Sequence, residues 1–138
     1  MIQYKTGNLL ESEAEALVNT VNTVGVMGKG IALQFKNLFP NNFKLYEKAC
    51  KNKEVKVGKL LITEEEALFS GKKIIINFPT KTNWRLPSEY QYIESGLEEL
   101  VKVIKEKNIK SIAIPPLGAG NGGLNWDKVK QIMEEYLS

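Results

Sequence analysis

The stretch Val21-Asn-Thr-Val-Gly-Val-Met-Gly-Lys-Gly30 decides the fold of this sequence. It follows an apolar run at residues 16–21, which is typical of a buried strand, and precedes residues 30–39, which have helical spacing. A second stretch of this kind, Pro115-Pro-Leu-Gly-Ala-Gly-Asn-Gly-Gly-Leu124, lies near the other end of the chain. Such loops present backbone N–H groups at a helix N-terminus, where anions bind. Two of them predict a ligand with more than one phosphate.

Short apolar or β-rich runs predict the remaining strands. Residues 1–6 alternate apolar and polar side chains, as an edge or half-buried strand does, until Gly7-Asn8 interrupts them. Residues 59–63 are β-rich, and residues 74–78 are apolar on both faces, like a central strand, before Pro79 ends them. Residues 111–114 lead into the second loop as a strand. The run Glu64-Glu-Glu66 indicates an exposed turn or the start of a helix.

Helical spacing follows both loops. The helix at residues 30–39 stops at Pro40, and either Asn41 or Asn42 caps a further helix that ends near residue 50. Residues 88–107 have the longest amphipathic pattern, and Asn125 caps a final helix at residues 126–137. Strands that alternate with helices predict an α/β fold with helices on both faces of a mixed sheet. Ligands of such sheets bind beyond the carboxyl ends of the strands, where both loops are expected.

Composition limits the possible chemistry. The 138 residues suffice for one domain, predicted to span residues 1–138, and the sequence contains no histidine and only one cysteine, Cys50. This excludes an internal disulfide and every His-based nucleophile pair, and it makes a zinc site improbable, so we expect no metal and no cofactor. No apolar stretch approaches the ~20 residues that cross a bilayer, and the N-terminus lacks a signal peptide. We therefore expect a cytoplasmic monomer that does not associate with a membrane.

The glycine-rich loops do not fit the two standard nucleotide-binding motifs. Gly118-x-Gly120-x-x-Gly123 matches the dinucleotide fingerprint, but only 15 residues follow Gly123, too few for the second strand and its acidic residue. The first loop contains Gly28-Lys29, but Gly30 stands where a Walker motif needs Ser or Thr for magnesium. The loops therefore belong to another class of phosphate-binding protein.

Four segments in the same order resemble a macrodomain, and within that family the DNA ADP-ribosyl glycohydrolase antitoxins of the DarG type. They are Thr6-Gly-Asn-Leu-Leu10, residues 16–35 around the first loop, Asn77-Phe-Pro-Thr-Lys81 with Trp84-Arg85, and residues 116–126. The resemblance covers nearly the whole chain. It implies a three-layer α/β/α fold with a central mixed sheet. Macrodomains usually add a last strand after the final helix, and because the sequence ends at Ser138 we expect the sheet to lack that strand.

The resemblance also implies a binding site for ADP-ribose. It places the adenine at Asn8 and Leu9, although most relatives have aspartate at the position of Asn8, and it places the distal ribose against Asn22. Asn8 can still accept from the adenine amino group through its carbonyl oxygen. The remaining ADP-ribose contacts implied by the two loops and the end of the intervening strand are Asn19, Thr23, Gly25, Val26, Met27, Gly28, Lys29, Gly30, Pro79, Thr80, Leu117, Gly118, Ala119, Gly120, Asn121, Gly122, Gly123 and Leu124.

Simpler interpretations of several of these residues remain open. Gly7-Asn8 is also the sequence of an ordinary turn. Asn19 and Asn22 are placed where amides commonly satisfy backbone groups at the end of a strand. The glycines of both loops can serve only to make turns, although four of them between Gly118 and Asp127 favour a close approach of backbone to a ligand.

Lys81 is the predicted catalytic residue, together with Asn22. An amine at the edge of the cleft can attack the anomeric carbon, or it can stabilise the leaving base and orient water. Nucleophilic attack requires a lowered lysine pKa, since free lysine titrates near ~10.4. A related group that acts on protein carboxylates pairs such a lysine with an aspartate in the second loop, but Gly122 stands at that position here. The two-residue mechanism is therefore not expected.

Trp84 and Arg85 are candidates for stacking on a nucleobase and clamping its phosphate, or for packing at the edge of the sheet. Trp126 and Cys50 are assigned to packing. By resemblance the predicted function is hydrolysis of the N-glycosidic bond between ADP-ribose and thymine in single-stranded DNA. The alternatives are a non-catalytic ADP-ribose reader and a hydrolase of protein-linked or O-acetylated ADP-ribose. A cognate DNA ADP-ribosyltransferase toxin is a possible partner implied by the same resemblance.

Overall fold

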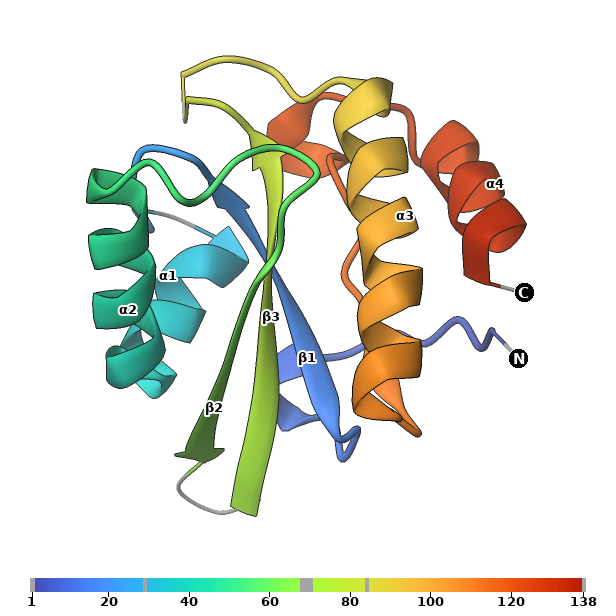
Figure 1. Ribbon diagram of the computed structural model, residues 1–138. Coiled ribbons are helices and arrows are strands. Elements are labelled where there is room, and N and C mark those ends of the chain that lie inside the picture. The colour runs from blue at the N-terminus through green and yellow to red at the C-terminus, as the bar shows by residue number, and fades with distance from the viewer. Residues whose placement is uncertain (1, 29, 68–70, 84, 138) are drawn as a thin grey trace.

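The computed structural model describes residues 2–28, 30–67, 71–83 and 85–137, which form a three-layer α/β/α fold. The four-stranded sheet has the order β2-β3-β1-β4, with α1 and α2 on one face and α3 and α4 on the other (Figure 1). The predicted α/β fold with a mixed sheet is confirmed. The elements are η1 (Leu9–Glu11), β1 (Ala16–Asn22), α1 (Gly30–Leu38), α2 (Pro40–Lys51), β2 (Leu61–Ala67), β3 (Gly71–Lys81), α3 (Tyr90–Lys107), β4 (Ile112–Ala113), η2 (Gly120–Gly122) and α4 (Trp126–Leu137).

The register of the sheet brings the loops together. β1 pairs in parallel with β3 on one side and with β4 on the other, while β2 and β3 form an antiparallel hairpin. Because carboxyl ends of parallel strands lie at one edge, the segments that follow β1, β3 and β4 meet there. Both glycine-rich loops are among these segments. The final residues of β1 and β3, Asn22 and Lys81, are register partners across a shift in the pairing.

Alternating side chains of the central strands fill the core on both faces. Val18 of β1 and Ile76 of β3 pack with α3 and α4, whereas Leu17 and Ile75 pack against Phe35 and Phe39 of the α1 region. Each strand is therefore apolar on both sides, as expected for a covered parallel sheet. A Cβ atom at Gly96 of α3 would lie 2.2 Å from Cζ of Phe78, so the helix packs closely on β3.

The predicted strand at residues 1–6 is wrong. Residues 2–6 adopt no regular secondary structure, and Tyr4 donates its hydroxyl proton to Glu134 of α4. The ammonium of Lys130 lies 4.4 Å from the centre of the Tyr4 ring, a cation–π contact that also holds the segment to α4. Contacts of Tyr4 with α4, and not pairing with the sheet, therefore hold this segment.

Two predictions about the β2–β3 hairpin are also wrong. Glu64, Glu65 and Glu66 do not form a turn or helix start but belong to β2, which begins at Leu61, two residues later than predicted. Pro79 does not end β3, which continues to Lys81. The pairing of β2 with β3 stops at the pair Leu61 and Asn77, so Pro79 lies beyond the part of β3 that is flanked on both sides.

The start of α2 differs from the prediction because its cap comes from another element. The helix begins at Pro40, and neither Asn41 nor Asn42 is its N-cap. Instead, the carboxylate of Glu65 in β2 accepts hydrogen bonds from the backbone N–H groups of Asn41 (3.3 Å) and Asn42 (2.7 Å). An acidic group at this end also complements the helix dipole. The other helices agree with the prediction within two residues at each end, and Asn125 Oδ1 accepts from the N–H of Lys128 as the predicted cap of α4.

Candidate functional site: a cleft between two glycine-rich loops

A cleft of about 400 Å³ opens at the carboxyl ends of the parallel strands. Its floor is the end of β1 and β3, and its walls are the two glycine-rich loops and the first turn of α1. The described residues that line it are Thr20, Val21, Asn22, Val26, Gly28, Ile31, Ala32, Thr80, Lys81, Pro115, Pro116, Gly118, Ala119, Gly120 and Gly122. Lys81 is the only member of this set with a titratable side chain. The rest of the lining is backbone, amide, hydroxyl or apolar.

Asn22 organises the first loop. Its Oδ1 accepts hydrogen bonds from the backbone N–H groups of Val24 (3.0 Å), Gly25 (3.1 Å) and Val26 (3.3 Å), and its Nδ2 donates to the carbonyl of Val26 (2.8 Å). The chain must curl around the side chain for three successive N–H groups to reach one oxygen. The amide therefore fixes the shape of the loop, and one Nδ2 hydrogen remains for a ligand.

Tyr46 of α2 supports this arrangement from below. Its hydroxyl lies 2.8 Å from both the backbone oxygen and Oδ1 of Asn22, and the residue has no exposed surface. Burial raises the pKa of Tyr46 far above its usual range, so the hydroxyl remains protonated and able to donate. Gly25 packs on the same helix, since a Cβ atom built there would lie 3.4 Å from Cβ of Cys50. The first loop thus rests on α2 through both a hydrogen bond and close packing.

A cluster of buried amides lies beneath the loop. Asn77 Nδ2 donates to Asn42 Oδ1 (2.8 Å) and to the carbonyl of Leu61 (3.1 Å), while Asn42 Nδ2 donates to Asn77 Oδ1 (3.1 Å). Asn19 Nδ2 lies 3.5 Å from the same Oδ1 of Asn77, and Asn19 Oδ1 has no protein partner. Asn19, predicted as a ligand contact, is fully buried and is not among the residues that line the cleft.

Lys81 lies beside Asn22 at the floor of the cleft. The two residues are register partners, and the backbone N–H and hydroxyl of Thr23 both donate to the carbonyl of Thr82, at 3.3 and 2.6 Å. These bonds join the start of the first loop to the end of β3. The Lys81 side chain is half-buried and faces a cleft whose other described lining residues are uncharged.

The second loop leaves no room for side chains at two of its glycines. Gly118 has a φ of 72°, and a Cβ atom there would lie 2.6 Å from Cδ1 of Leu124. A Cβ atom at Gly122 would lie 2.6 Å from Oγ of Ser88, whose backbone N–H donates to the Gly122 carbonyl (2.9 Å). Ser88 Oγ is buried and has no hydrogen-bond partner. Ser88 therefore occupies the space that a side chain would need at Gly122, the position where the related group has its catalytic aspartate.

Comparison with known proteins identifies the family. The sequence profile described as "Macro domain" matches residues 18–133. The chain belongs to the macrodomain family. It is 59% identical over 131 residues to the "DNA ADP-ribosyl glycohydrolase" of Mycobacterium tuberculosis, with 95% of this chain and 37% of that protein covered. It is 54% identical to the protein of the same name from Thermus aquaticus, with 99% and 38% covered. The macrodomain thus spans little more than a third of the length of these curated relatives.

Solved structures agree. The macrodomain of Mycobacterium tuberculosis DarG superimposes with a TM-score of 0.94 at 57% identity, covering 99% of this chain and 89% of that one. Thermosipho africanus DarTG, solved in complex with ADP-ribose, superimposes with a TM-score of 0.88 at 40% identity, covering 95% of this chain and 37% of that one. The resemblance to macrodomains of the DarG type seen in the sequence is therefore confirmed.

Nine of the 22 residues predicted to bind or act on ADP-ribose line the cleft of this macrodomain. Asn22, Val26, Gly28, Thr80, Lys81 and several glycines of the second loop line it. Met27, Leu117 and Pro79 are instead buried, the first two in the apolar clusters below the cleft. Sequence reasoning missed Thr20, Val21, Ile31, Ala32, Pro115 and Pro116. Val21, Pro115 and Pro116 belong to the two glycine-rich stretches themselves, and Thr20, Ile31 and Ala32 directly flank the first, so taking each whole stretch with its neighbours could have found them.

The remaining predicted contacts lie elsewhere. Asn8 caps η1, where its Oδ1 accepts from the N–H of Leu10 (3.0 Å), as the turn interpretation expects. Leu9 packs against the same apolar cluster as Ile31 of the cleft wall, which places the predicted adenine contacts on the α1 side of the sheet. Gly25, Gly30, Gly123 and Leu124 belong to the loops but do not line the cleft, and nothing is described of the Asn121 side chain.

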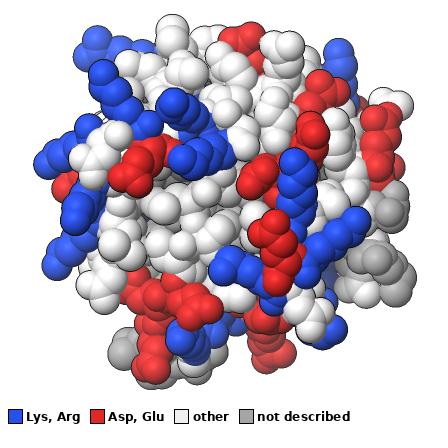
Figure 2. Space-filling view, viewed as in Figure 1, with Lys and Arg blue, Asp and Glu red and all other residues white. Residues whose placement is uncertain are grey.

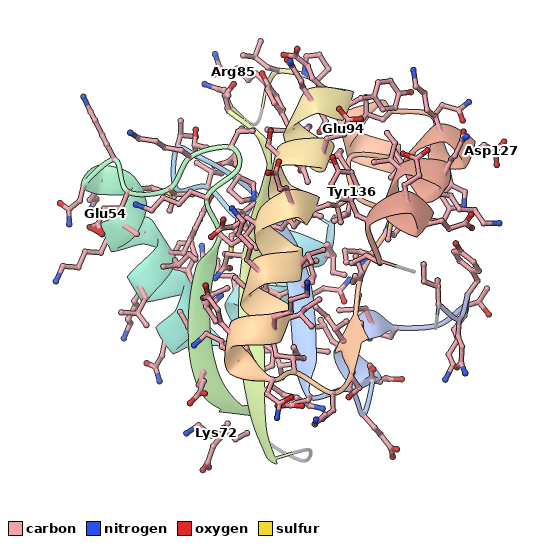
Figure 3. All side chains as sticks on the ribbon, turned by 45° about the vertical axis from the view of Figure 1, so that its right-hand side comes forward. Glu54, Lys72, Arg85, Glu94, Asp127 and Tyr136 are labelled. Atoms are coloured by element: carbon pink, nitrogen blue, oxygen red, sulfur yellow. The ribbon has the colours of Figure 1, made fainter. Side chains whose placement is uncertain are left out.

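Two predicted residues, Lys29 and Trp84, lie outside the described residues. Arg85 is exposed at the end of the molecule where the parallel strands finish, opposite Lys72 at the turn of the β2–β3 hairpin (Figure 3). Within the described ranges, no group of three or more acidic or cysteine side chains is arranged to hold a metal ion. No described helix is long and apolar enough to cross a membrane.

Proposed function

We propose that this macrodomain removes ADP-ribose from DNA by hydrolysing the N-glycosidic bond to a base, thymine in single-stranded DNA. The observation that carries the proposal is the composition of the cleft. Among the described lining residues, Lys81 alone can carry charge, and it lies at the floor beside Asn22. The relatives named DNA ADP-ribosyl glycohydrolase, at 54–59% identity, support the assignment of substrate.

In this proposal the two loops bind the diphosphate of ADP-ribose. Residues of both glycine-rich loops line a cleft of suitable size, and glycine permits a phosphate to approach the backbone closely. The solved complex of a relative at 40% identity with ADP-ribose supports the same ligand here. The adenine extends toward Asn8 and Leu9, and the free Nδ2 hydrogen of Asn22 donates to a hydroxyl of the distal ribose.

The reaction replaces a bond from the anomeric carbon to a base nitrogen with a bond to oxygen. The base leaves with its bonding electrons and takes up a proton, while water supplies the hydroxyl of the released ADP-ribose. Lys81 serves in one of two ways. Its unprotonated amine attacks the anomeric carbon and is later displaced by water, or its ammonium stabilises the leaving base while water attacks directly.

Substitution of Lys81 tests the function and separates these roles. Lys81→Ala is expected to bind ADP-ribose within a few fold of wild type but to release none from a modified oligonucleotide. Lys81→Arg keeps the positive charge but removes the nucleophile, so residual turnover favours the electrostatic role. The assay measures ADP-ribose released from an ADP-ribosylated thymidine oligonucleotide and from an ADP-ribosylated protein. Wild-type turnover by Lys81→Ala would contradict the lysine mechanism.

The same assay separates the enzyme from a non-catalytic reader. A reader binds ADP-ribose and leaves both substrates intact, whereas release from the protein alone indicates a different adduct. We further propose that the activity reverses the modification made by a DNA ADP-ribosyltransferase toxin. In Thermosipho africanus, a transferase and a glycohydrolase occur in one fusion protein, and this chain is 39% identical to part of it.

A further inference from the structure

Positive charge is concentrated in one segment of the chain. Six lysines and two glutamates lie between Lys44 and Lys59, a local excess of +4 where the whole chain has +3. Five of these lysines are exposed on the last turns of α2 and the loop that follows, and we call them the basic strip: Lys48, Lys51, Lys53, Lys56 and Lys59. Figure 2 shows that basic side chains prevail at its upper left, over this region, with a few carboxylates among them.

The basic strip lies next to the mouth of the cleft. The first glycine-rich loop separates them: it is bonded to Thr82 on the side of Lys81 and packs at Gly25 on Cys50 and Glu47 of α2 on the other side. Beyond α2, the strip continues toward α3, because a Cβ atom at Gly58 would lie 3.2 Å from Cβ of Ser95. The segment between α2 and β2, which carries the rest of the strip, crosses from α2 to α3 at the end of the molecule that holds the cleft (Figure 1).

Local structure explains only part of this charge. Lys48 and Lys51 lie in the last turn of α2, where cations favour the helix dipole. Local structure does not favour lysine at position 53. Lys53 has a φ of 57°, a left-handed conformation after the end of the helix that favours glycine. Among the described residues, no member of the basic strip forms an ion pair, although Glu47 and Glu54 are nearby in sequence. The charges are therefore available to a partner.

We propose that the basic strip binds the phosphate backbone of the DNA strand that carries the modified base, a role that rests on the proposed function. A strand that enters the cleft at Lys81 passes over the first loop and meets these lysines. The surface suits a polyanion better than a protein, because every exposed residue from Lys48 to Lys59 is polar or charged, and Leu45 is the one large apolar side chain exposed between Lys44 and Lys59. Protein interfaces need such side chains at their centre, whereas flexible lysines alone suffice for phosphates.

The test compares a strip variant with a control of equal charge. In Lys53→Gly with Lys56→Gln, glycine relieves the left-handed backbone, so thermal stability is expected to stay equal or rise. The control, Lys102→Gln with Lys105→Gln, removes two exposed lysines near the end of α3 that points away from the cleft. Binding of an unmodified 15-nucleotide single strand is measured by fluorescence anisotropy over a series of salt concentrations.

Each lost phosphate contact makes the negative slope of log K against log salt shallower by about 0.7 for single strands. The slope of the strip variant is therefore expected to be shallower by about 1.4, and that of the control by far less. With modified substrates, the strip variant should retain wild-type turnover of ADP-ribosylated thymidine nucleoside but lose roughly 3- to 10-fold in kcat/KM on the modified oligonucleotide.

Equal changes of slope in the two variants, or a wild-type slope in the strip variant, would overturn the proposal. The second result would favour an acidic protein as the partner of the basic strip. Failure of the wild type to release ADP-ribose from any DNA would instead reject the proposed function. The binding measurement does not depend on turnover, so the two failures are distinguishable.

Discussion

The hydrogen bond from Tyr46 to Asn22 makes the first loop depend on a residue that never meets the ligand. In Tyr46→Phe the ring remains in the core and only the hydroxyl is lost, 2.8 Å from two oxygens of Asn22. Removing one partner of a buried hydrogen bond costs about 1–3 kcal/mol. Asn22 Oδ1 keeps three backbone N–H donors, so the lower half of that range applies. For a domain of this size, about 1.5 kcal/mol lowers Tm by roughly 3–6 °C.

The same loss should weaken ligand binding, because the loop must be ordered to form one wall of the cleft. If ordering the loop takes up the whole of this free energy, the Kd for ADP-ribose rises about tenfold, since 1.4 kcal/mol corresponds to a factor of 10. The hydroxyl does not touch the reacting atoms, so kcat at saturation should change little. Calorimetry gives Tm and titration with ADP-ribose gives Kd.

The matched control is Tyr4→Phe, which removes a hydroxyl bonded to Glu134 on the opposite side of the molecule. It should leave the Kd unchanged. The reasoning is refuted if Tyr46→Phe lowers Tm as expected but binds ADP-ribose as tightly as the wild type, because the loop would then keep its shape without the bond. A variant with unchanged Tm would refute the hydrogen bond itself.

Two further predictions concern the second loop and alkaline pH. Gly122→Asp should reduce stability by roughly 1–3 kcal/mol without adding activity on protein-linked ADP-ribose, because the new Cβ atom meets Ser88 Oγ. Ser88→Gly in the same chain should restore part of the Tm. A gain of activity in Gly122→Asp alone would contradict the prediction. Burial raises the pKa of Tyr46 above its ordinary 10.0, so the folded protein holds this proton more tightly than the unfolded chain does. The contribution of Tyr46 to stability is therefore fully present below pH 10 and is lost as the pH rises further. Tm measured from about pH 8 to 11 should consequently fall less steeply in Tyr46→Phe than in the wild type.

The sequence predicted the elements whose signals are local. The apolar run at residues 16–21 and the long amphipathic pattern at residues 88–107 became β1 and α3 with bounds displaced by two residues or fewer. Their hydrophobic periods report burial directly, and no other part of the chain alters the result. The two glycine-rich loops were also predicted to face one cleft, which follows from the parallel pairing of β1 with its neighbours.

The errors arose where a distant residue determines the local structure. Glu65 of β2 caps α2, so the asparagines next to Pro40 were not needed as caps. The segment at residues 2–6 is held by α4 through the hydrogen bond of Tyr4 with Glu134, which joins residues 130 positions apart in the sequence. For the same reason sequence could place Asn22 in the site without showing that its amide oxygen is already bonded to three N–H groups and to Tyr46. Such partners are known only once the chain is folded.

The described lining of the cleft is nearly uncharged, and this sets how the two parts of the substrate are held. In the proposed complex the diphosphate lies between the two loops beside Lys81, where the cleft shields it from salt more than an open surface would. The basic strip lies outside the cleft, where its lysines are exposed and salt screens their charges strongly. Affinity for ADP-ribose should consequently change little with ionic strength, while affinity for the attached strand falls steeply. A rise in salt would thus release the strand before the ADP-ribose that it carries, so the contribution of each part can be separated in a single titration.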